Sequence, residues 1–382
     1  MINGKELKMQ IVRNEKGEAA RITMPRWFDA HLHVRHGEML KLVLPFTAAY
    51  CDCATIMPNR KRDKWDFGIL SGRDVAGYRA EILSALDRHI YFRHPFAPIM
   101  TVKITDETTP EMVEDAWKEG ALAGKGYPLG VTTNTEKGIT DFRQLWPVFG
   151  KMEELGMLLL LHGTVPRKPG AKITEEGERE LEWAFIPTLL EIHRAFPRLK
   201  IVLEHVTTKR AVNLISTLPE TVRATITAHH PLLTLDQVLE GGKIKNVHNY
   251  CEPVAKGERD REALEEALVS GDPHYLFGTD SAPHPELEKL WTDEKQGKPG
   301  TFTAPIAYSL RIELFEKHGC LEKLEPHTSG SGMEHYGLEH SERTVTFVKK
   351  PWVVPDRYGD VVPFKAGETL QWQIEETINA GG

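Results

Sequence analysis

Short runs of apolar and β-branched residues recur along this chain, and longer stretches with helical spacing of apolar residues lie between them. Such runs are typical of buried strands, and regular strand-then-helix alternation is typical of a parallel sheet. The strand candidates end at PRWFDAHLH, DCATIMPN, APIMTVKIT, LAGKGYP, GMLLLLH, LKIVLEH, VRATITAH and HYLFGTD. They number eight, which closes a barrel. We therefore predict an α/β fold, the (β/α)8 TIM barrel.

Helical spacing is clearest in four of the intervening stretches. These are Asp74 to Arg88, Thr109 to Glu119, Glu175 to Phe196 and Arg259 to Val269. No low-complexity linker interrupts the series, so we predict that residues 1–382 form a single barrel domain, although length alone would also allow two domains.

The two ends of the chain are predicted to be additions to the barrel. Residues 1–24 are expected to form a hairpin extension that turns at Asn14 to Gly17, with Met9 to Val12 in one arm. Residues 351–382 keep recurring aromatic and apolar residues, so we expect an ordered segment that packs on the barrel.

Composition narrows the classes of partner and location. With 48 Lys and Arg against 55 Asp and Glu, a formal charge of -7 and no basic stripe, we expect no nucleic-acid partner. The polar N-terminus does not look like a secretory signal, and no segment reaches the ~20 apolar residues that span a bilayer, so we expect no membrane partner. The four cysteines are expected to be reduced thiols in a cytoplasmic protein. Metal ligation by Cys51 and Cys53 is the less favoured alternative.

Chemically competent side chains fall at the C-terminal ends of the predicted strands. In a (β/α)8 barrel those ends converge on one face, which carries the active site. Residues far apart in sequence are therefore expected to meet in one pocket. The candidates in chain order are His31, His33, Asn59, Lys125, His162, His205, His229, His230 and Asp280.

The histidines favour metal binding. His31 and His33 are two residues apart, so on extended backbone both imidazoles point to one side and can hold a metal ion. An isolated pair of this kind is usually a surface or hydrogen-bonded pair, but the further candidate ligands on later strands favour metal binding here. His162 and His205 each end an apolar strand, where burying an unpaired imidazole is costly. A satisfied core histidine would explain one of them, whereas joint ligation of a second metal explains both.

Lys125 and Asp280 complete the candidate site. A cationic Lys125 would be repelled by nearby metal ions, whereas reaction with carbon dioxide would give a carbamate that bridges two metals. A salt-bridged structural lysine is the alternative. Asp280 in GTDSAPH can ligate a metal and also exchange a proton, as hydrolysis requires. GTD alone is weak evidence, and His284 four residues later makes the motif more specific.

These residues together resemble the amidohydrolase superfamily, and more closely its dihydroorotase family of the short, barrel-only type. The resemblance runs from about Trp27 to Gln373 and is carried by DAHLHVR, MPN, GKGYP, TTN, LLHGTV, LEHVTTK, ATITAHH, YCEP, GTDSAPH and FTAP. It implies a metal-dependent amidohydrolase that reversibly hydrolyses (S)-dihydroorotate to N-carbamoyl-L-aspartate in de novo pyrimidine (UMP) biosynthesis. By analogy it also suggests a homodimer.

The resemblance implies a role for each candidate. The implied ligands of two zinc ions, bridged by N6-carboxylated Lys125, are His31, His33, Lys125, His162, His205 and Asp280, with Asp280 also the catalytic acid and base. The implied substrate contacts are Arg35, Asn59, Thr132, Thr133, Glu252, His284 and Ala304. Among these, Thr132 and Thr133 would lie on a mobile loop that closes over the ligand. A planar guanidinium suits a carboxylate, which supports Arg35 independently.

Two positions depart from the family's pattern. Gly126 stands where a larger apolar residue is usual, and Glu252 stands where a leucine is expected, adding a negative charge near an anionic ligand. Two other functions remain open. One is a hydantoinase-like imidase acting on neutral rings, against which Arg35 argues. The other is a catalytically silent binding homologue, which would usually have lost metal ligands.

Overall fold

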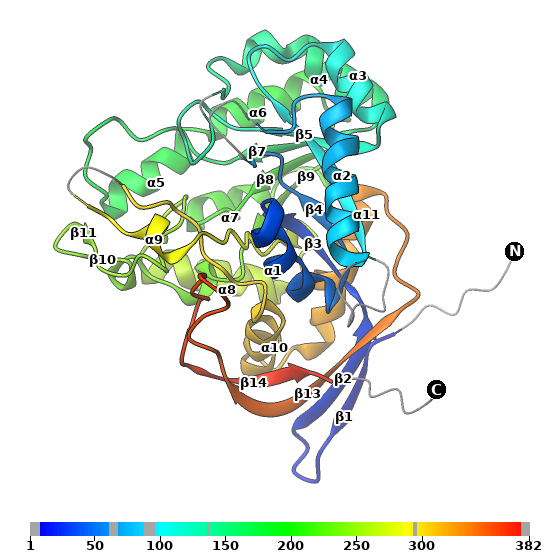
Figure 1. Cartoon of the computed structure of the whole chain (residues 1–382), viewed down its shortest axis with the longest axis vertical. Coiled ribbons are helices and arrows are strands. Elements are labelled where there is room, and N and C mark those ends of the chain that lie inside the picture. The colour runs from blue at the N-terminus through cyan, green and yellow to red at the C-terminus, as the bar shows by residue number, and fades with distance from the viewer. Residues whose placement is uncertain (1–7, 61–67, 88–95, 136, 293–295, 376–382) are drawn as a thin grey trace, which may run out of the picture.

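The computed structural model describes residues 8–60, 68–87, 96–135, 137–292 and 296–375. Within them, eight parallel strands form one sheet in the order β12-β9-β8-β7-β6-β5-β4-β3. Their bounds are β3 Trp27–Leu32, β4 Cys51–Ile56, β5 Ala97–Ile104, β6 Ala121–Gly126, β7 Leu158–His162, β8 Ile201–Glu204, β9 Val222–Ile226 and β12 Tyr275–Phe277. Each corresponds to one strand candidate, so the predicted (β/α)8 barrel is confirmed (Figure 1).

The outer strands of this sheet, β3 and β12, approach each other and nearly close the barrel. The backbone N–H of Asp280, just after β12, donates to the carbonyl of His31 at 2.9 Å. The buried carboxylate of Asp29 accepts hydrogen bonds from the N–H and the hydroxyl of Thr279, at 2.8 and 2.6 Å. Side chains therefore complete a seam for which the three-residue β12 is too short.

Two apolar layers flank the strands. On β8, Val202 belongs to the layer inside the barrel and Leu203 to the layer between strands and helices, as the two-residue period of a strand requires. Inside, Val202 is joined by Phe28, Ala123 and Leu160. The inner layer fills the barrel below the site, so polar groups are confined to the C-terminal ends of the strands.

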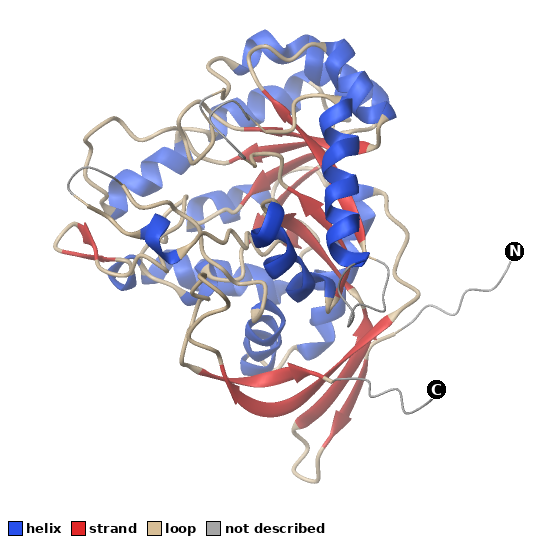
Figure 2. Ribbon diagram, viewed as in Figure 1, coloured by secondary structure: helices blue, strands red, loops and turns tan. Residues whose placement is uncertain are grey.

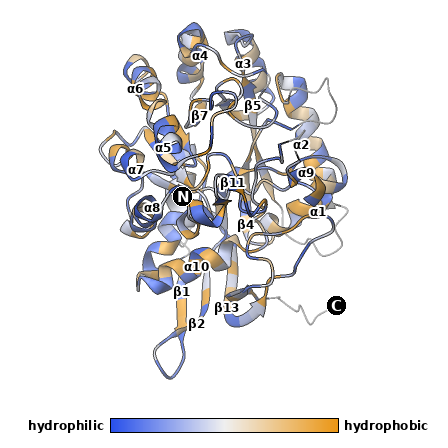
Figure 3. Cartoon of the chain, turned by 90° about the vertical axis from the view of Figure 1, so that its left-hand side faces the viewer, coloured by the Kyte–Doolittle hydropathy of each residue, from blue (hydrophilic) through white to orange (hydrophobic). Residues whose placement is uncertain are grey.

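Helices surround the barrel (Figure 3). Their bounds are α1 Gly37–Ala48, α2 Gly72–Asp87, α3 Pro110–Lys118, α4 Trp146–Leu155, α5 Glu175–Trp183, α6 Ile186–Ala195, α7 Lys209–Ile215, α8 Glu258–Ser270, α9 Glu286–Lys289, α10 Ala307–Lys317 and α11 Ser331–Tyr336. Searched over the described residues, no helix has the combined length and apolar character needed to cross a bilayer. The four cysteines are buried free thiols.

The stretch with helical spacing from Glu175 to Phe196 forms two helices, α5 and α6, with a break after Trp183. Pro187 in the first turn of α6 has no N–H to bond the carbonyl of Trp183, and its ring would clash with that carbonyl in a continuous helix. The spacing of apolar residues alone did not reveal this break between the two helices.

A second sheet lies beside the barrel, with its strands apart from the barrel strands in Figure 2. It is antiparallel in the order β1-β2-β13-β14, where β1 is Gln10–Arg13, β2 is Ala19–Pro25, β13 is Thr344–Val353 and β14 is Thr369–Ile374. A two-stranded ribbon, β10 Leu239–Glu240 and β11 Lys243–Ile244, completes the strands. The turn between β1 and β2 uses Gly17 at φ 79°, where glycine is favoured. Residues 1–7 and 376–382 of the predicted terminal additions lie outside the described residues.

The second sheet joins the two ends of the chain and packs on α10. β13 pairs with β2 as well as with β14, and it starts at Thr344, before the predicted boundary at 351. Trp372 of β14 is fully buried. Its backbone N–H donates to the hydroxyl oxygen of Ser309 at 3.1 Å, and its ring nitrogen donates to Glu316 at 3.2 Å. These contacts tie the C-terminal strand to α10.

Replacing Trp372 by alanine is expected to lower the free energy of unfolding by about 3–5 kcal/mol, because it removes a fully buried aromatic side chain. Trp146→Ala is the matched control, since Trp146 is 38% exposed and should cost less than about 1 kcal/mol. Urea unfolding followed by circular dichroism measures both. Equal effects would show that the second sheet does not stabilise the barrel.

Candidate active site

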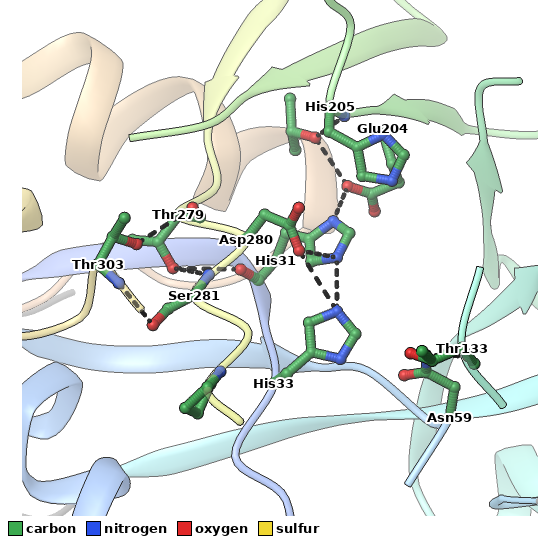
Figure 4. Close-up of polar contacts among 12 residues, drawn as sticks. His31, His33, Asn59, Thr133, Glu204, His205, Thr279, Asp280, Ser281 and Thr303 are labelled. Atoms are coloured by element: carbon green, nitrogen blue, oxygen red, sulfur yellow. Dashed lines mark hydrogen bonds and ion pairs between the residues drawn. The ribbon is translucent and has the colours of Figure 1, made fainter. Parts of the chain in front are cut away.

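Three ligand-type side chains meet at the closing seam of the barrel. The Nε2 atoms of His31 and His33 lie 3.3 Å apart, and Oδ1 of Asp280 lies 3.3 Å from the first and 3.4 Å from the second (Figure 4). All three residues are buried. Two imidazole nitrogens and a carboxylate oxygen converging at these distances are a suitable donor set for a divalent cation.

A second group of donors lies on the neighbouring strands. Lys125 is the penultimate residue of β6, His162 ends β7 and His205 follows β8, with the rings of His162 and His205 4.4 Å apart. Nζ of Lys125, Nε2 of His162 and Nδ1 of His205 are buried without a hydrogen-bond partner among the described residues. Buried polar atoms without partners are costly, so these three fit a bound cation on this side of the site.

Burial sets the charge of these groups. It lowers the pKa of Lys125 to about 8, with Glu204 opposing the shift, so a substantial fraction of the amine is neutral near pH 7–8. It also lowers the pKa of His33 to about 4 and those of His162 and His205 well below the usual range. Neutral imidazole is the form that ligates metals, and a neutral amine is the form that reacts with carbon dioxide.

For Asp280, the neighbouring histidines outweigh the effect of burial on the pKa. Burial would raise its pKa, but His31 and His33 hold it below its ordinary value, so the carboxylate is ionised at neutral pH. Of the described non-glycine residues, five have positive φ, and four of them are at this site: Arg35, Asn134, His205 and Asp280. Such conformations cost about 1–3 kcal/mol each and cluster at functional sites.

Glu204 is a site residue that the sequence analysis missed. It is fully buried beneath the donors, and its Oε2 accepts from Nδ1 of His31 at 2.5 Å and from the hydroxyl of Thr225 at 2.7 Å. Its Oε1 lies 3.8 Å from Nζ of Lys125. The carboxylate therefore fixes the tautomer that leaves Nε2 of His31 free to ligate. Its position two residues after the inward-facing Val202 was an available signal.

Arg35, one of the predicted substrate-binding residues, lies at the edge of the pocket. Its Nε donates to the carbonyl of Pro283 at 2.8 Å, and its Nη2 lies 3.0 Å from Nε2 of His284. Burial lowers the pKa of Arg35 to about 10, which still leaves it charged at neutral pH. Arg35 and Asn59 line the pocket with the metal-ligand candidates, and His284 borders it through Arg35.

The Thr132–Thr133 loop covers the pocket. Both threonines line it, and the carbonyl of Thr133 lies 3.4 Å from the amide nitrogen of Asn59 (Figure 4). Asn134 returns a bond to the carbonyl of Asn59 at 2.9 Å. The volume that the centres of water molecules could occupy inside the pocket is ≈ 30 Å³.

The remaining predicted positions differ in how they relate to the pocket. Glu252 lines it, whereas Ala304 does not, and the N–H of Ala304 is bonded to the hydroxyl of Ser281 at 3.0 Å. Gly126 is explained by packing, because a Cβ there would lie 3.1 Å from Ile139 and 3.3 Å from Leu161.

His229 and His230 lie with Cys251, a neighbour that the sequence analysis did not assign to them. Their ligand-type atoms are within 4.8 Å of one another. His230 already bonds the Thr227 hydroxyl at 2.8 Å and the Pro253 carbonyl at 3.0 Å. Both its nitrogens are therefore engaged within the protein.

Comparisons with known proteins agree with this geometry. No protein-family model matches the chain. A dihydroorotase of Teredinibacter turnerae is 39% identical over 360 residues, which cover 93% of this chain and 99% of the relative. The mitochondrial dihydroorotase of Arabidopsis thaliana is 39% identical over 379 residues, covering 97% and 94%.

Solved structures extend the comparison. A Saccharomyces cerevisiae dihydroorotase crystallised with 5-fluoroorotic acid has a TM-score of 0.83 at 32% identity, covering 93% of this chain and 98% of that one. An L-hydantoinase from Arthrobacter aurescens has a TM-score of 0.75 at 13% identity and covers 92% and 82%, a likeness of fold alone.

The barrel and its cluster of histidines, lysine and aspartate define a hydrolase of the amidohydrolase superfamily. With relatives near 39% identity across almost the whole length, the chain belongs to the dihydroorotase family.

Replacing Glu204 by glutamine is expected to weaken the affinity of the site for a divalent metal ion by about 10- to 100-fold, because His31 loses the carboxylate that orients it. Competition with a chelator measures the affinity, and Glu334→Gln, on the exposed surface, is the control. Unchanged affinity in Glu204→Gln would show that His31 is held by the backbone alone.

Proposed function

We propose that the protein is a dihydroorotase that interconverts (S)-dihydroorotate and N-carbamoyl-L-aspartate in de novo pyrimidine (UMP) biosynthesis. The observation that carries this proposal is the placement of a partly buried, charged Arg35 beside the His31, His33 and Asp280 cluster. A guanidinium at that position suits a substrate whose carboxylate lies next to the bond being hydrolysed. The four free thiols support a reducing, cytoplasmic location.

The proposed cofactor is a pair of zinc ions. His31, His33 and Asp280 would hold one ion, His162 and His205 the other, and carboxylated Lys125 would bridge them. The unpartnered buried nitrogens and the lowered pKa of Lys125 support this set. Zinc bound there would supply Lewis-acid polarisation of the ring carbonyl and a water acidic enough to attack at neutral pH.

The protein's own groups would orient the substrate and move the proton. Arg35, with Asn59 and His284, would hold the substrate carboxylate and fix the ring's orientation. Asp280 starts ionised, so it can take the proton released by the attacking water and pass it to the ring nitrogen as the C–N bond breaks. In ring closure the same transfers run in reverse.

The Thr132–Thr133 loop would control access to this chemistry. Both threonines line the pocket beside the metal-ligand candidates, so movement of this loop would let substrate enter. Once closed again, it would exclude bulk water from the reacting groups.

Replacing Asp280 by asparagine is expected to lower kcat for dihydroorotate by at least ~10²-fold, the usual contribution of a general acid or base. Metal analysis is the control, with about two zinc ions per chain expected in the parent. If Asp280→Asn keeps its zinc and turns over within a few-fold of the parent, proton transfer belongs to another group.

The purified, zinc-loaded protein is expected to open dihydroorotate and to act very poorly on dihydrouracil, with kcat/KM lower by roughly 10⁴ to 10⁵. Without a carboxylate on the ring, Arg35 and His284 would be left unpaired by the ligand. Equal efficiency on dihydrouracil or hydantoin would replace this proposal with the imidase function.

In the same assay, Arg35→Met should lower kcat/KM for dihydroorotate by at least about 10²-fold, because the charge-assisted bonds that orient the ring are lost. Zinc content should stay unchanged, since Arg35 is not a proposed ligand. A loss of zinc in this variant would mean that Arg35 supports the metal site itself.

A further inference from the structure

A carboxylate on the wall of the pocket needs an explanation. Glu252 lines the same pocket as His31, Arg35 and Asp280, and its side chain is only 13% exposed. If the substrate is an anion, a free carboxylate at this position would repel it. Like charges brought together at a binding surface cost several kcal/mol.

The Glu252 carboxylate is held by two partners. Nη2 of Arg167 lies 3.1 Å from Oε1 and 3.4 Å from Oε2, and the hydroxyl of Tyr250 donates to Oε1 at 2.8 Å. Arg167 also binds Glu178 of α5, with Nε and Nη2 2.8 and 2.7 Å from Oε1. Among the described residues, the Glu252 carboxylate thus contacts Arg167 and Tyr250 and none of the metal-ligand candidates.

These contacts join segments distant in sequence. Arg167 lies in the loop between β7 and α5, and Glu252 lies in the loop between β11 and α8, 85 positions further on. Arg167 is 22% exposed and Glu178 is 3% exposed, so the ion pairs are largely shielded from solvent. Partly buried pairs of this kind are weakly screened by salt, and losing one partner leaves an uncompensated charge.

The charge state of the group follows from the same contacts. Burial raises the pKa of Glu252, and Glu178 adds to that shift, while Arg167 and Tyr250 oppose it. The acidic neighbours hold the pKa of Arg167 above its ordinary value against the effect of burial, so it stays cationic. Arg167 therefore supplies a permanent positive charge next to Glu252.

We propose that Arg167 is a positioning residue for the reaction: it holds the Glu252 carboxylate against the β7–α5 loop and offsets part of its charge, so that the pocket accepts an anionic ring. This inference rests on the proposed function, which supplies the anionic substrate. It accounts for a glutamate at a position where the family resemblance leads one to expect leucine.

A double-mutant cycle tests this role. The variants are Arg167→Gln, Glu252→Gln and the two together, and each is assayed for kcat and KM with dihydroorotate, zinc content and calorimetric affinity for orotate. Arg167→Gln is expected to raise KM and the orotate Kd by about tenfold or more, with zinc retained and kcat changed far less. In the Glu252→Gln background the same change should alter KM by no more than about twofold.

Two further variants guard against misfolding. Arg167→Lys keeps the charge and should recover most of the affinity lost in Arg167→Gln. Glu178→Gln removes the other partner of Arg167, and repeating the cycle in that background avoids leaving Glu178 buried without a cation, so the comparison holds even if Arg167→Gln alone is unstable.

The outcomes separate this inference from the proposed function. An unchanged KM in Arg167→Gln, or an equal loss with and without Glu252, would overturn the positioning role and leave the dihydroorotase function standing. A parent that binds orotate with the expected pattern across the variants, but does not open dihydroorotate, would overturn the function and retain the role. A parent that binds no orotate would overturn both.

Discussion

The seam between β3 and β12 is the contact on which the site depends. β12 is three residues long, so the barrel closes through Asp29, which accepts two hydrogen bonds from Thr279, and through the N–H of Asp280 on the carbonyl of His31. That registration brings the Asp280 carboxylate within 3.4 Å of both imidazoles. Desolvated hydrogen bonds to a buried carboxylate are costly to break, so the first and last strands are held in one register.

The site lies above the apolar interior of the barrel and contains buried polar and ionisable groups, which a protein core usually excludes. Lys125, His162 and His205 are buried with unsatisfied atoms, and Arg35, His205 and Asp280 adopt backbone conformations that non-glycine residues avoid. Their cost must be met by the surrounding packing and by whatever the site binds. The base of the site is packed against the barrel interior, whereas the movement proposed for ligand access lies in the Thr132–Thr133 loop.

Charged side chains around this pocket are repeatedly paired with oppositely charged neighbours. Glu204 lies between His31 and Lys125 beneath the donors, and Arg167 lies between Glu178 and Glu252 on the wall. In each case a charged side chain is paired with an oppositely charged neighbour from another segment of the chain before a ligand arrives. The low-dielectric surroundings then make the remaining charges, such as Arg35, more effective toward an anion.

The sequence by itself determined the barrel and most of the candidate site. Eight apolar strands, each ending in a polar residue, leave little freedom, because parallel strands in a closed barrel must present their C-terminal ends on one face. His31, Lys125, His162 and Asp280 were predictable for that reason.

The division between α5 and α6 could have been read from Pro187, but the continuous apolar spacing of this stretch obscured it.

Only the tertiary structure decided which residues act by positioning other residues. Glu204 could be placed by strand parity, yet its bond to His31 spans 173 positions, and that of Arg167 to Glu252 spans 85. Loops carry no periodicity, so the pairing of their side chains depends on packing in three dimensions, which no local pattern encodes.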